Sequence, residues 1–239
     1  MNVAIDAGNS RIKWGIHDGT SWVKQGSVPT EDAAALAGIA AHWPADARVV
    51  ACSVAGATVE STIEKVVGER GLPLFWARSE ASAHGVRNGY DQPERLGADR
   101  WAALIGARSK VRGACLVVCA GTATTVDWLD GAGNFRGGLI LPGVNLMLAA
   151  LARNTAQLPH AEGEYRAEPH NTMDAIVSGC LNAQAGAIER MFAKVSAEER
   201  ADCLMTGGAA YRILPCLGIP CRMEGALVLD GLLRYASGV

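Results

Sequence analysis

Two segments of the sequence, one at the N-terminus and one near the middle, repeat the same pattern of residue types. They read IDAGNSRIKW at 5–14 and VCAGTATTVDW at 118–128. Each begins with apolar residues typical of a buried strand, turns through Ala-Gly and small polar residues, and continues as a second strand that ends near Trp. Because each segment is followed by further strands and then helices, we interpret the chain as two related halves, residues 1–112 and 113–239.

Hydrophobic periodicity along the chain predicts an α/β fold, with strands and helices intermixed in both halves. In the first half we expect strands at 2–6, 12–17, 21–28, 49–54 and 72–77, and helices at 31–43, 57–70 and 94–111. In the second half we expect strands within 114–129, 134–141 and 201–208, and helices at 143–153, 172–194, 208–214 and 225–236. Residues 78–92 are polar and contain glycine, which predicts a loop.

Composition excludes several classes of protein. Hydrophobic residues make up 49% of the 239 residues, enough for one large core or two smaller ones. The net charge of −2 argues against a nucleic-acid-binding surface. The N-terminal residues lack a signal-peptide pattern, and no uncharged run reaches the roughly 18–20 residues of a membrane span. Seven cysteines without a CxxC pair are typical of buried thiols, so we expect a reduced, cytoplasmic protein with neither nucleic acid nor membrane as a partner.

The first repeated segment carries the residues of a phosphate-binding hairpin. Glycine at the turn of Asp6-Ala7-Gly8-Asn9-Ser10 allows backbone N–H groups to approach a ligand closely, and Lys13 adds a positive charge. A carboxylate beside a phosphate is repelled unless a divalent cation lies between them, so Asp6 is a candidate Mg²⁺ ligand. The alternative is an ordinary hairpin in which Asp6 caps the turn.

The second segment supplies a matching hairpin without bulky side chains, Gly121-Thr122-Ala123-Thr124-Thr125. Two such hairpins facing each other could hold the phosphates of a nucleotide from both sides. Gly207-Gly208 ends a later strand and would let a base or ribose lie against the backbone, although Gly-Gly pairs commonly just end strands.

A third group of polar residues, Gly97-Ala98-Asp99-Arg100, comes directly before an apolar helix. Asp99 could accept a proton from a substrate hydroxyl while Arg100 holds an anionic substrate group. The alternative is a helix-capping acid followed by a solvated arginine.

Taken together, DAGNSRIK at 6–13, Tyr90, GADR at 97–100, GTATTVD at 121–127, GGLILPG at 137–143 and NTMDAIVSG at 171–179 resemble the type III pantothenate kinase family in order and spacing along nearly the whole chain. The family belongs to the acetate kinase/sugar kinase/Hsp70/actin superfamily. The resemblance implies two ribonuclease H-like halves, each a mixed five-stranded sheet with helices, with a nucleotide cleft between them. It implies ATP-dependent phosphorylation of pantothenate to 4′-phosphopantothenate, the first step of coenzyme A synthesis.

The resemblance also assigns roles to individual residues. ATP is expected to bind at Asp6, Ala7, Gly8, Asn9, Ser10, Arg11, Ile12, Lys13 and Thr122, with Mg²⁺ at Asp6. Pantothenate is expected to bind at Tyr90, Gly97, Ala98, Asp99, Arg100 and Thr172, with Asp99 as the catalytic proton acceptor. Family members are homodimers with the pantothenate pocket near the subunit interface, so Thr172 is expected to act across it.

One position departs from the family pattern. Many members have Asp just before x-Gly-Thr in the second hairpin, where it binds a monovalent cation such as K⁺, but here the residue is Cys119. A thiol is a poor ligand for a hard alkali cation. Either K⁺ or NH₄⁺ is dispensable here, or another oxygen binds it, with Asp127 as a candidate if its side chain points into the cleft.

Two other functions stay open from the sequence. A different small-molecule kinase of the same superfamily would share the phosphate hairpins and differ only in its acceptor pocket. A non-catalytic nucleotide-binding regulator would share the fold, although the presence of Asp6, Lys13 and Asp99 argues against loss of catalysis.

Overall fold

The computed structural model describes residues 1–154, 163–198 and 200–236, which form two compact units. Unit 1 contains Met1–Lys110 together with Ala226–Val239, and unit 2 contains Val111–Gly225. Each unit is built on its own five-stranded sheet.

Unit 1 contains a mixed sheet with the strand order β3-β2-β1-β4-β5. The central strand β1 pairs antiparallel with β2 and parallel with β4, while β3 and β5 form the edges. The strands are β1 (Asn2–Ala7), β2 (Arg11–His17), β3 (Trp22–Pro29), β4 (Arg48–Ser53) and β5 (Leu74–Trp76). This order brings the β1–β2 hairpin to the centre of one sheet end.

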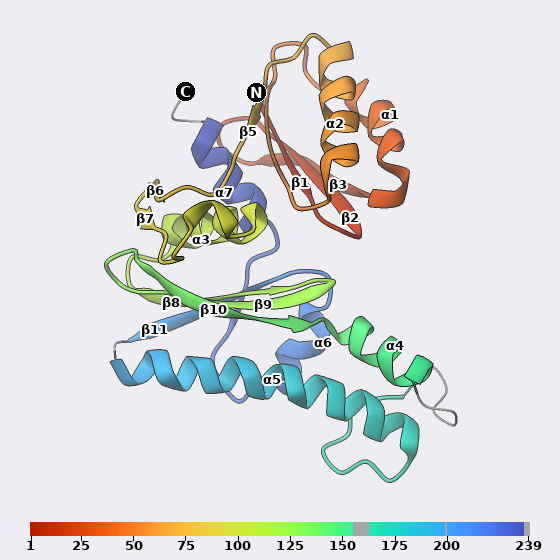
Figure 1. The fold of residues 1–239 in the computed structure, drawn as a ribbon, viewed down its shortest axis with the longest axis vertical. Coiled ribbons are helices and arrows are strands. Elements are labelled where there is room, and N and C mark those ends of the chain that lie inside the picture. Colours follow the sequence, from red (N-terminus) through yellow and green to blue (C-terminus); the bar gives the residue numbers. More distant parts are fainter. Residues whose placement is uncertain (155–162, 199, 237–239) are drawn as a thin grey trace. The chain divides into compact units, whose positions relative to one another are not determined.

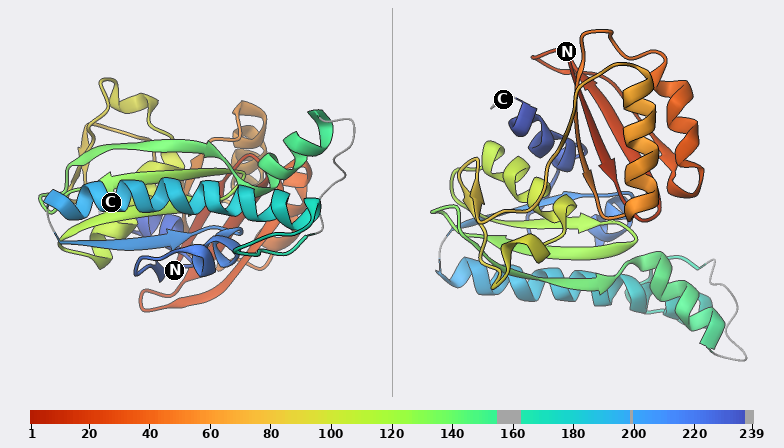
Figure 2. Two further views of the ribbon diagram at one scale, coloured as in Figure 1. Left: turned by 90° about the horizontal axis from the view of Figure 1, so that it is seen from below. Right: turned by 45° about the horizontal axis from the view of Figure 1, so that its top comes forward.

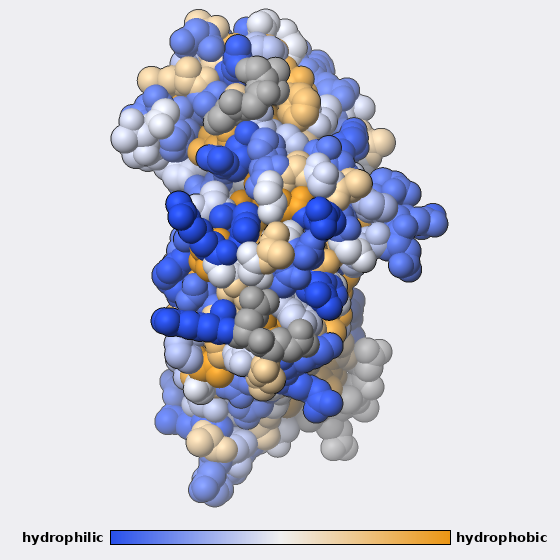
Figure 3. Space-filling view, turned by 90° about the vertical axis from the view of Figure 1, so that its left-hand side faces the viewer, coloured by the Kyte–Doolittle hydropathy of each residue, from blue (hydrophilic) through white to orange (hydrophobic). Residues whose placement is uncertain are grey.

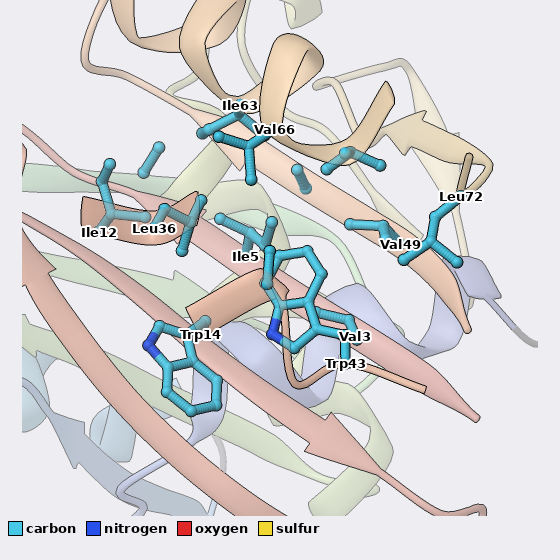
Figure 4. Packing of buried hydrophobic residues seen from close by; sticks show 14 of the residues in the cluster. Val3, Ile5, Ile12, Trp14, Leu36, Trp43, Val49, Ile63, Val66 and Leu72 are labelled. Carbon is cyan, nitrogen blue, oxygen red and sulfur yellow. The ribbon is translucent and has the colours of Figure 1, made fainter. Parts of the chain in front are cut away.

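Helices lie on both faces of this sheet, as Figure 1 shows. On one face are η1 (Thr30–Ala35), α1 (Leu36–Ala40) and α2 (Ala57–Glu69), and on the other are α3 (Ala98–Lys110) and α7 (Leu227–Ala236). Ile5 and Ile12 are fully buried among the residues that pack under α1 and α2, together with Trp14 (Figure 4). Because side chains alternate along a strand, Asp6 lies on the opposite face from Ile5, the face of α3 and α7.

Unit 2 repeats this topology, with the strand order β10-β9-β8-β11-β12. Its strands are β8 (Ala114–Ala120), β9 (Ala123–Leu129), β10 (Phe135–Pro142), β11 (Ala201–Thr206) and β12 (Arg222–Met223). The long helix α5 (Thr172–Glu198) runs along one face of the sheet, as Figures 1 and 2 show, and α4 (Val144–Asn154), α6 (Ala210–Ile213) and η3 (Leu214–Cys216) complete the unit. The predicted α/β class, with two mixed five-stranded sheets, is thus confirmed.

Some elements differ in detail from the expectation. The helix expected at 31–43 is a 3₁₀ segment followed by short α1, because Asp32 adopts non-helical backbone angles. The loop expected at 78–92 contains a small hairpin of β6 (Ser82–Ala83) and β7 (Val86–Arg87). The helix expected from 94 begins at Ala98, after the 3₁₀ turn η2 (Pro93–Arg95).

The C-terminal helix α7 is grouped with unit 1, whereas the sequence reading placed residues 225–236 in the second half. The cause is a close crossing of α7 and α3. A Cβ on Gly231 would lie 1.8 Å from the Ala102 carbonyl oxygen, so only glycine allows this approach. Lys110 Nζ also lies 3.0 Å from an Asp230 carboxylate oxygen. A reading of consecutive repeats cannot detect a terminal helix that returns to the first unit.

No helix within the described residues has both the length and the apolar character needed to cross a membrane. On the face shown in Figure 3, hydrophilic and hydrophobic residues alternate in small areas.

Candidate functional site

The Asp6 carboxylate lies between two polar neighbours on adjacent strands. Register pairs Asp6 with Lys13 on β2 and with Cys52 on β4, so all three side chains share one face of the sheet. Lys13 Nζ is 4.0 Å from Asp6 Oδ2, and the Cys52 thiol donates a long contact of 3.8 Å to Asp6 Oδ1. The sheet therefore places an acid, a base and a thiol side by side at the end of the central strand.

Asp6 is only 6% exposed, and its charge is poorly compensated. The pKa of Asp6 is raised from 3.8 to about 6, mainly by burial and also by nearby Asp99, whereas Lys13 and Cys52 act in the opposite direction. Among the described residues, the Asp6 carboxylate has a distant ammonium and a weak thiol donor as neighbours, which leaves it capacity to bind a cation. These residues therefore fit a divalent ion, which prefers carboxylate oxygen.

The turn after β1 presents small polar groups to solvent. Gly8 N–H donates to the Arg11 carbonyl at 3.1 Å, which closes the hairpin, and Asn9 and Ser10 are exposed. Thr30, just after β3, donates its hydroxyl to the Gly8 carbonyl at 2.7 Å. The turn is thus fixed from two sides while its tip stays accessible.

Not every residue of the first motif offers its side chain to a ligand. Ala7 and Ile12 are fully buried in the apolar core, so they can contact a ligand only through the backbone. Arg11 extends to β3, where its Nη2 is 2.7 Å from Ser27 Oγ.

Asp99 lies in the first turn of α3, whose first residue is Ala98. One carboxylate oxygen of Asp99 accepts a hydrogen bond from the Arg100 backbone N–H at 2.8 Å. A Cβ on Gly97 would lie 2.7 Å from this same oxygen, so glycine makes room for the carboxylate. Since Asp99 raises the pKa of Asp6, these two acids belong to one electrostatic cluster.

Arg100 is 4% exposed and is oriented by Tyr90. Its Nη1 donates to the Tyr90 hydroxyl at 2.7 Å, and its guanidinium carbon lies 5.6 Å from the centre of the Tyr90 ring. Asn88 orders the loop by accepting from the Tyr90 N–H at 3.1 Å and donating to the Pro93 carbonyl at 3.0 Å. A hollow of about 430 Å³ adjoins this pair and is lined by Gly89, Tyr90, Asp91, Gln92 and Arg95.

In unit 2, the turn between β8 and β9 is packed closely by two glycines from elsewhere in the chain. Thr122 is exposed, and its carbonyl accepts from the Gly143 N–H at 2.9 Å. Gly207 has φ +105°, and a Cβ there would lie 2.2 Å from the Ala120 carbonyl oxygen. The predicted turn at Gly207-Gly208, between β11 and α6, thus lies against the second hairpin.

Cys119 occupies the position in β8 that Asp6 occupies in β1. Its cross-strand neighbours are Thr125 on β9 and Thr206 on β11. The Thr125 hydroxyl is buried and has no hydrogen-bond partner within the described part of the chain. Asp127 is fully buried and pairs with Val117, which lies two residues further from the hairpin tip than Cys119. The side chains beside Cys119 on the neighbouring strands are therefore hydroxyls, and neither of them is a carboxylate.

Thr172 is the first residue of α5 and is exposed. Asn171 caps the helix, since its side-chain oxygen accepts from the Asp174 N–H at 2.9 Å. Thr172 belongs to unit 2, whereas Tyr90, Asp99 and Arg100 belong to unit 1.

Three residues near the site were missed by the sequence reading, namely Cys52, Asn88 and Thr30. Cys52 becomes a neighbour of Asp6 only through the parallel pairing of β1 and β4, which a linear motif does not contain. Asn88 stands before Gly in a polar loop, a pattern that signals a turn but not which side chain the turn orients.

A family model described as type III pantothenate kinase matches residues 2–194. A protein named type III pantothenate kinase from Aromatoleum aromaticum is 54% identical over 236 residues, covering 99% of this chain and 98% of the relative. A protein of the same name from Dechloromonas aromatica is 48% identical over 236 residues, covering 99% of both chains.

Solved structures resemble the fold at low sequence identity. The ethanolamine utilization protein EutJ from Carboxydothermus hydrogenoformans has a TM-score of 0.59 at 15% identity and covers 98% of this chain and 89% of its own. MreB5 of Spiroplasma citri, bound to ADP, has a TM-score of 0.55 at 10% identity and covers 99% of this chain and 96% of its own. These likenesses support the ribonuclease H-like architecture of both units.

Proposed function

The chain belongs to the type III pantothenate kinase family, and from this membership we propose which of its residues carry out the reaction. The protein uses ATP to phosphorylate pantothenate to 4′-phosphopantothenate, the first step of coenzyme A synthesis. The observation that carries the residue assignment is the cluster of Asp6, Lys13 and Asp99 at one end of the first sheet.

We propose that Asp6 holds Mg²⁺ and that the hairpin after β1 binds ATP phosphates. When bound, Mg²⁺ neutralises negative charge on the phosphate oxygens. The poorly compensated carboxylate of Asp6 supports this role, and Lys13 supplies a positive charge beside it. Asn9 and Ser10 would donate from the exposed turn, which the Gly8 N–H closes through its bond to the Arg11 carbonyl, while Ala7 and Ile12 can contribute only backbone groups.

The second hairpin completes the proposed ATP contacts through Thr122. The Thr122 side chain is exposed at the β8–β9 turn. The Gly143 N–H bonds to the Thr122 carbonyl, and Gly207 packs against the same turn. A hydroxyl and backbone N–H groups can bind phosphate oxygens without adding charge.

Asp99 is proposed to orient the primary hydroxyl of pantothenate and to accept its proton as the oxygen attacks the γ-phosphorus in line. The bond between the γ-phosphorus and the bridging oxygen of ATP breaks, and ADP leaves. Arg100, held by Tyr90, is preorganised to bind the carboxylate of pantothenate, an interaction stronger than one between neutral groups. Gly97 and Ala98 would line the same site, since they begin the helix that carries Asp99.

The residues around Cys119 fit a monovalent cation poorly. A thiol is a soft ligand, whereas alkali cations prefer oxygen. The buried hydroxyl of Thr125, the cross-strand neighbour of Cys119, is an oxygen that could still bind a cation. We therefore propose that the reaction depends only weakly on K⁺ or NH₄⁺.

We also propose that the protein is cytoplasmic and forms a homodimer. Edge strand β10 and helix α4 expose apolar side chains, with Ile140 64% exposed and Leu139, Leu146 and Leu151 between 37% and 41% exposed. A second copy would remove this surface from water. In such a dimer, Thr172 of one subunit would contact pantothenate held by the other.

The proposed roles can be tested by measuring transfer of labelled phosphate from ATP to pantothenate. Substituting Asp99→Asn keeps the shape and removes the proton acceptor, so kcat should fall by about 10²–10⁴. The matched control is Glu94→Gln, an exposed acid in η2 that precedes the motif, which should keep full activity. A panel of sugars and hydroxy acids checks acceptor specificity. A folded Asp99→Asn protein with wild-type kcat would remove Asp99 from this role.

A further inference from the structure

Unit 2 gathers four of the seven cysteines in one apolar cluster. Cys180 and Cys203 are buried in it, and Cys216 and Cys221 pack against it partly exposed. Within the described residues, no group of three or more His, Cys, Asp or Glu side chains is arranged to hold a metal ion.

Two of the four are direct neighbours across the sheet. Strands β11 and β12 run parallel, with Leu204 opposite Arg222 and Met205 opposite Met223. Continued one residue back, the same register sets Cys203 of β11 opposite Cys221, which directly precedes β12. Neighbouring strands are about 4.8 Å apart, inside the Cα separation of roughly 4.4–6.8 Å that a disulfide spans. The Cys203 thiol already donates a hydrogen bond to the Cys221 sulfur.

The two thiols differ in the way that a nucleophile differs from its resolving partner. The hydrogen bond that Cys221 accepts lowers its pKa, and Cys221 is partly exposed. The same hydrogen bond together with burial raises the pKa of Cys203, which is 3% exposed. A small oxidant therefore meets Cys221 first, and Cys203 is shielded until it reacts with its neighbour.

We propose that Cys203 and Cys221 form a reversible disulfide, a covalent modification site that joins β12 to β11. A low-molecular-weight disulfide such as oxidised glutathione serves as the oxidant. The Cys221 thiolate attacks one of its sulfurs and expels a thiolate, and Cys203 then loses its proton and attacks the Cys221 sulfur, which expels the second. The two cysteines lose two electrons and two protons in total, and the small disulfide is reduced to two thiols.

The disulfide would join a very short strand covalently to its neighbour. Strand β12 has only two residues, and the next backbone bond to β11 runs from the Glu224 N–H to the Met205 carbonyl at 2.8 Å. The closed loop contains the Gly207-Gly208 turn, and the chain leaves unit 2 at Gly225. Oxidation thus limits opening of the last segment of unit 2 without adding any non-covalent contact.

The test treats the full-length protein with oxidised glutathione and maps linked peptides by mass spectrometry after the remaining thiols are alkylated. We expect one peptide pair joined through Cys203 and Cys221, cleaved again by dithiothreitol. The thermal midpoint of the oxidised protein should rise by about 5 °C or more. Amide hydrogen exchange at 222–224 should slow several-fold on oxidation.

Two variants separate this pair from its neighbours. Cys221→Ser should abolish both the linked peptide and the rise in thermal midpoint. Cys216→Ser is the matched control, because Cys216 is equally a partly exposed member of the cluster, and a serine hydroxyl can still donate to the Arg212 carbonyl. Complete alkylation of Cys203 and Cys221 after oxidation would overturn the proposal, as would a link from either of them to Cys115, Cys180 or Cys216.

Discussion

Replacing Asp6 by Asn should make the ligand-free protein more stable while it abolishes kinase activity. The substitution removes a negative charge from a position that is 6% exposed and keeps the size of the side chain. Protonated Asp and Asn are both neutral and polar, so the free-energy cost of burying either side chain is nearly the same. The difference between them is the cost of keeping a carboxylate ionised in the fold.

The pKa of Asp6 sets the size and sign of this effect. It rises from 3.8 in the unfolded chain to about 6 in the fold, and a shift of about 2 units corresponds to about 3 kcal/mol. Because the folded pKa is the higher one, the folded state holds the proton more tightly than the unfolded state. The associated stability is therefore present below pH 3.8 and is lost as the pH rises through about 6.

The variant should gain somewhat less than this full amount. Lys13 loses its partner at 4.0 Å, but its side chain is 45% exposed, so the lost attraction is largely screened. We expect Asp6→Asn to be more stable than wild type by about 1–3 kcal/mol at pH 8. The advantage should grow between about pH 4 and pH 6 and stay level above that range.

The assay is urea unfolding in EDTA at a series of pH values, with the free energy of unfolding compared between the two proteins. Asp46→Asn is the control, since that side chain is 82% exposed, and it should change stability by less than about 0.5 kcal/mol. Adding Mg²⁺ and ATP should then stabilise wild type more than the variant. An Asp6→Asn protein that is no more stable than wild type at pH 8 would refute the reasoning.

Three further predictions follow from single contacts. Tyr90→Phe removes the hydroxyl that accepts from Arg100, so KM for pantothenate should rise about 5-fold to 100-fold with a smaller change in kcat, as steady-state kinetics will show. Gly231→Ala places a Cβ against the Ala102 carbonyl, so the free energy of unfolding should fall by about 1–3 kcal/mol or more in urea titrations. Replacing Na⁺ by K⁺ should change kcat/KM of wild type by less than about tenfold, because the Cys119 thiol is a poor alkali-metal ligand. A larger response would mean that other oxygens bind the ion.

The sequence predicts the parts of the molecule in which neighbours along the chain act together. The alternation Val3, Ile5 and Ala7 against Asp6 follows from strand geometry, and it predicts both the buried core and the isolated carboxylate. Gly207 likewise indicates a close approach, although the sequence assigns it to a base or ribose and the structure shows the Ala120 carbonyl there.

Contacts between distant segments were beyond a sequence reading. The neighbour of Asp6 on β4 depends on parallel pairing across an intervening hairpin and helices, and Cys52 carries no signature of that position. The grouping of α7 with unit 1 depends on how Gly231 meets α3, a contact more than 100 residues apart along the chain. Such pairings are stabilised by burial of surfaces from distant segments, and a local sequence pattern contains no information about them.

The two units also show why a duplicated scaffold differs in charge at equivalent positions. One residue before its end, each central strand carries a side chain flanked by one neighbour on an antiparallel strand and one on a parallel strand. In unit 1 that residue is Asp6, and in unit 2 it is Cys119, with threonine hydroxyls beside it. A second carboxylate next to a triphosphate would add like-charge repulsion that needs another cation for compensation. A neutral thiol avoids this requirement, which agrees with the proposed roles of Asp6 as the metal ligand and of the second hairpin as a phosphate contact through backbone and hydroxyl groups.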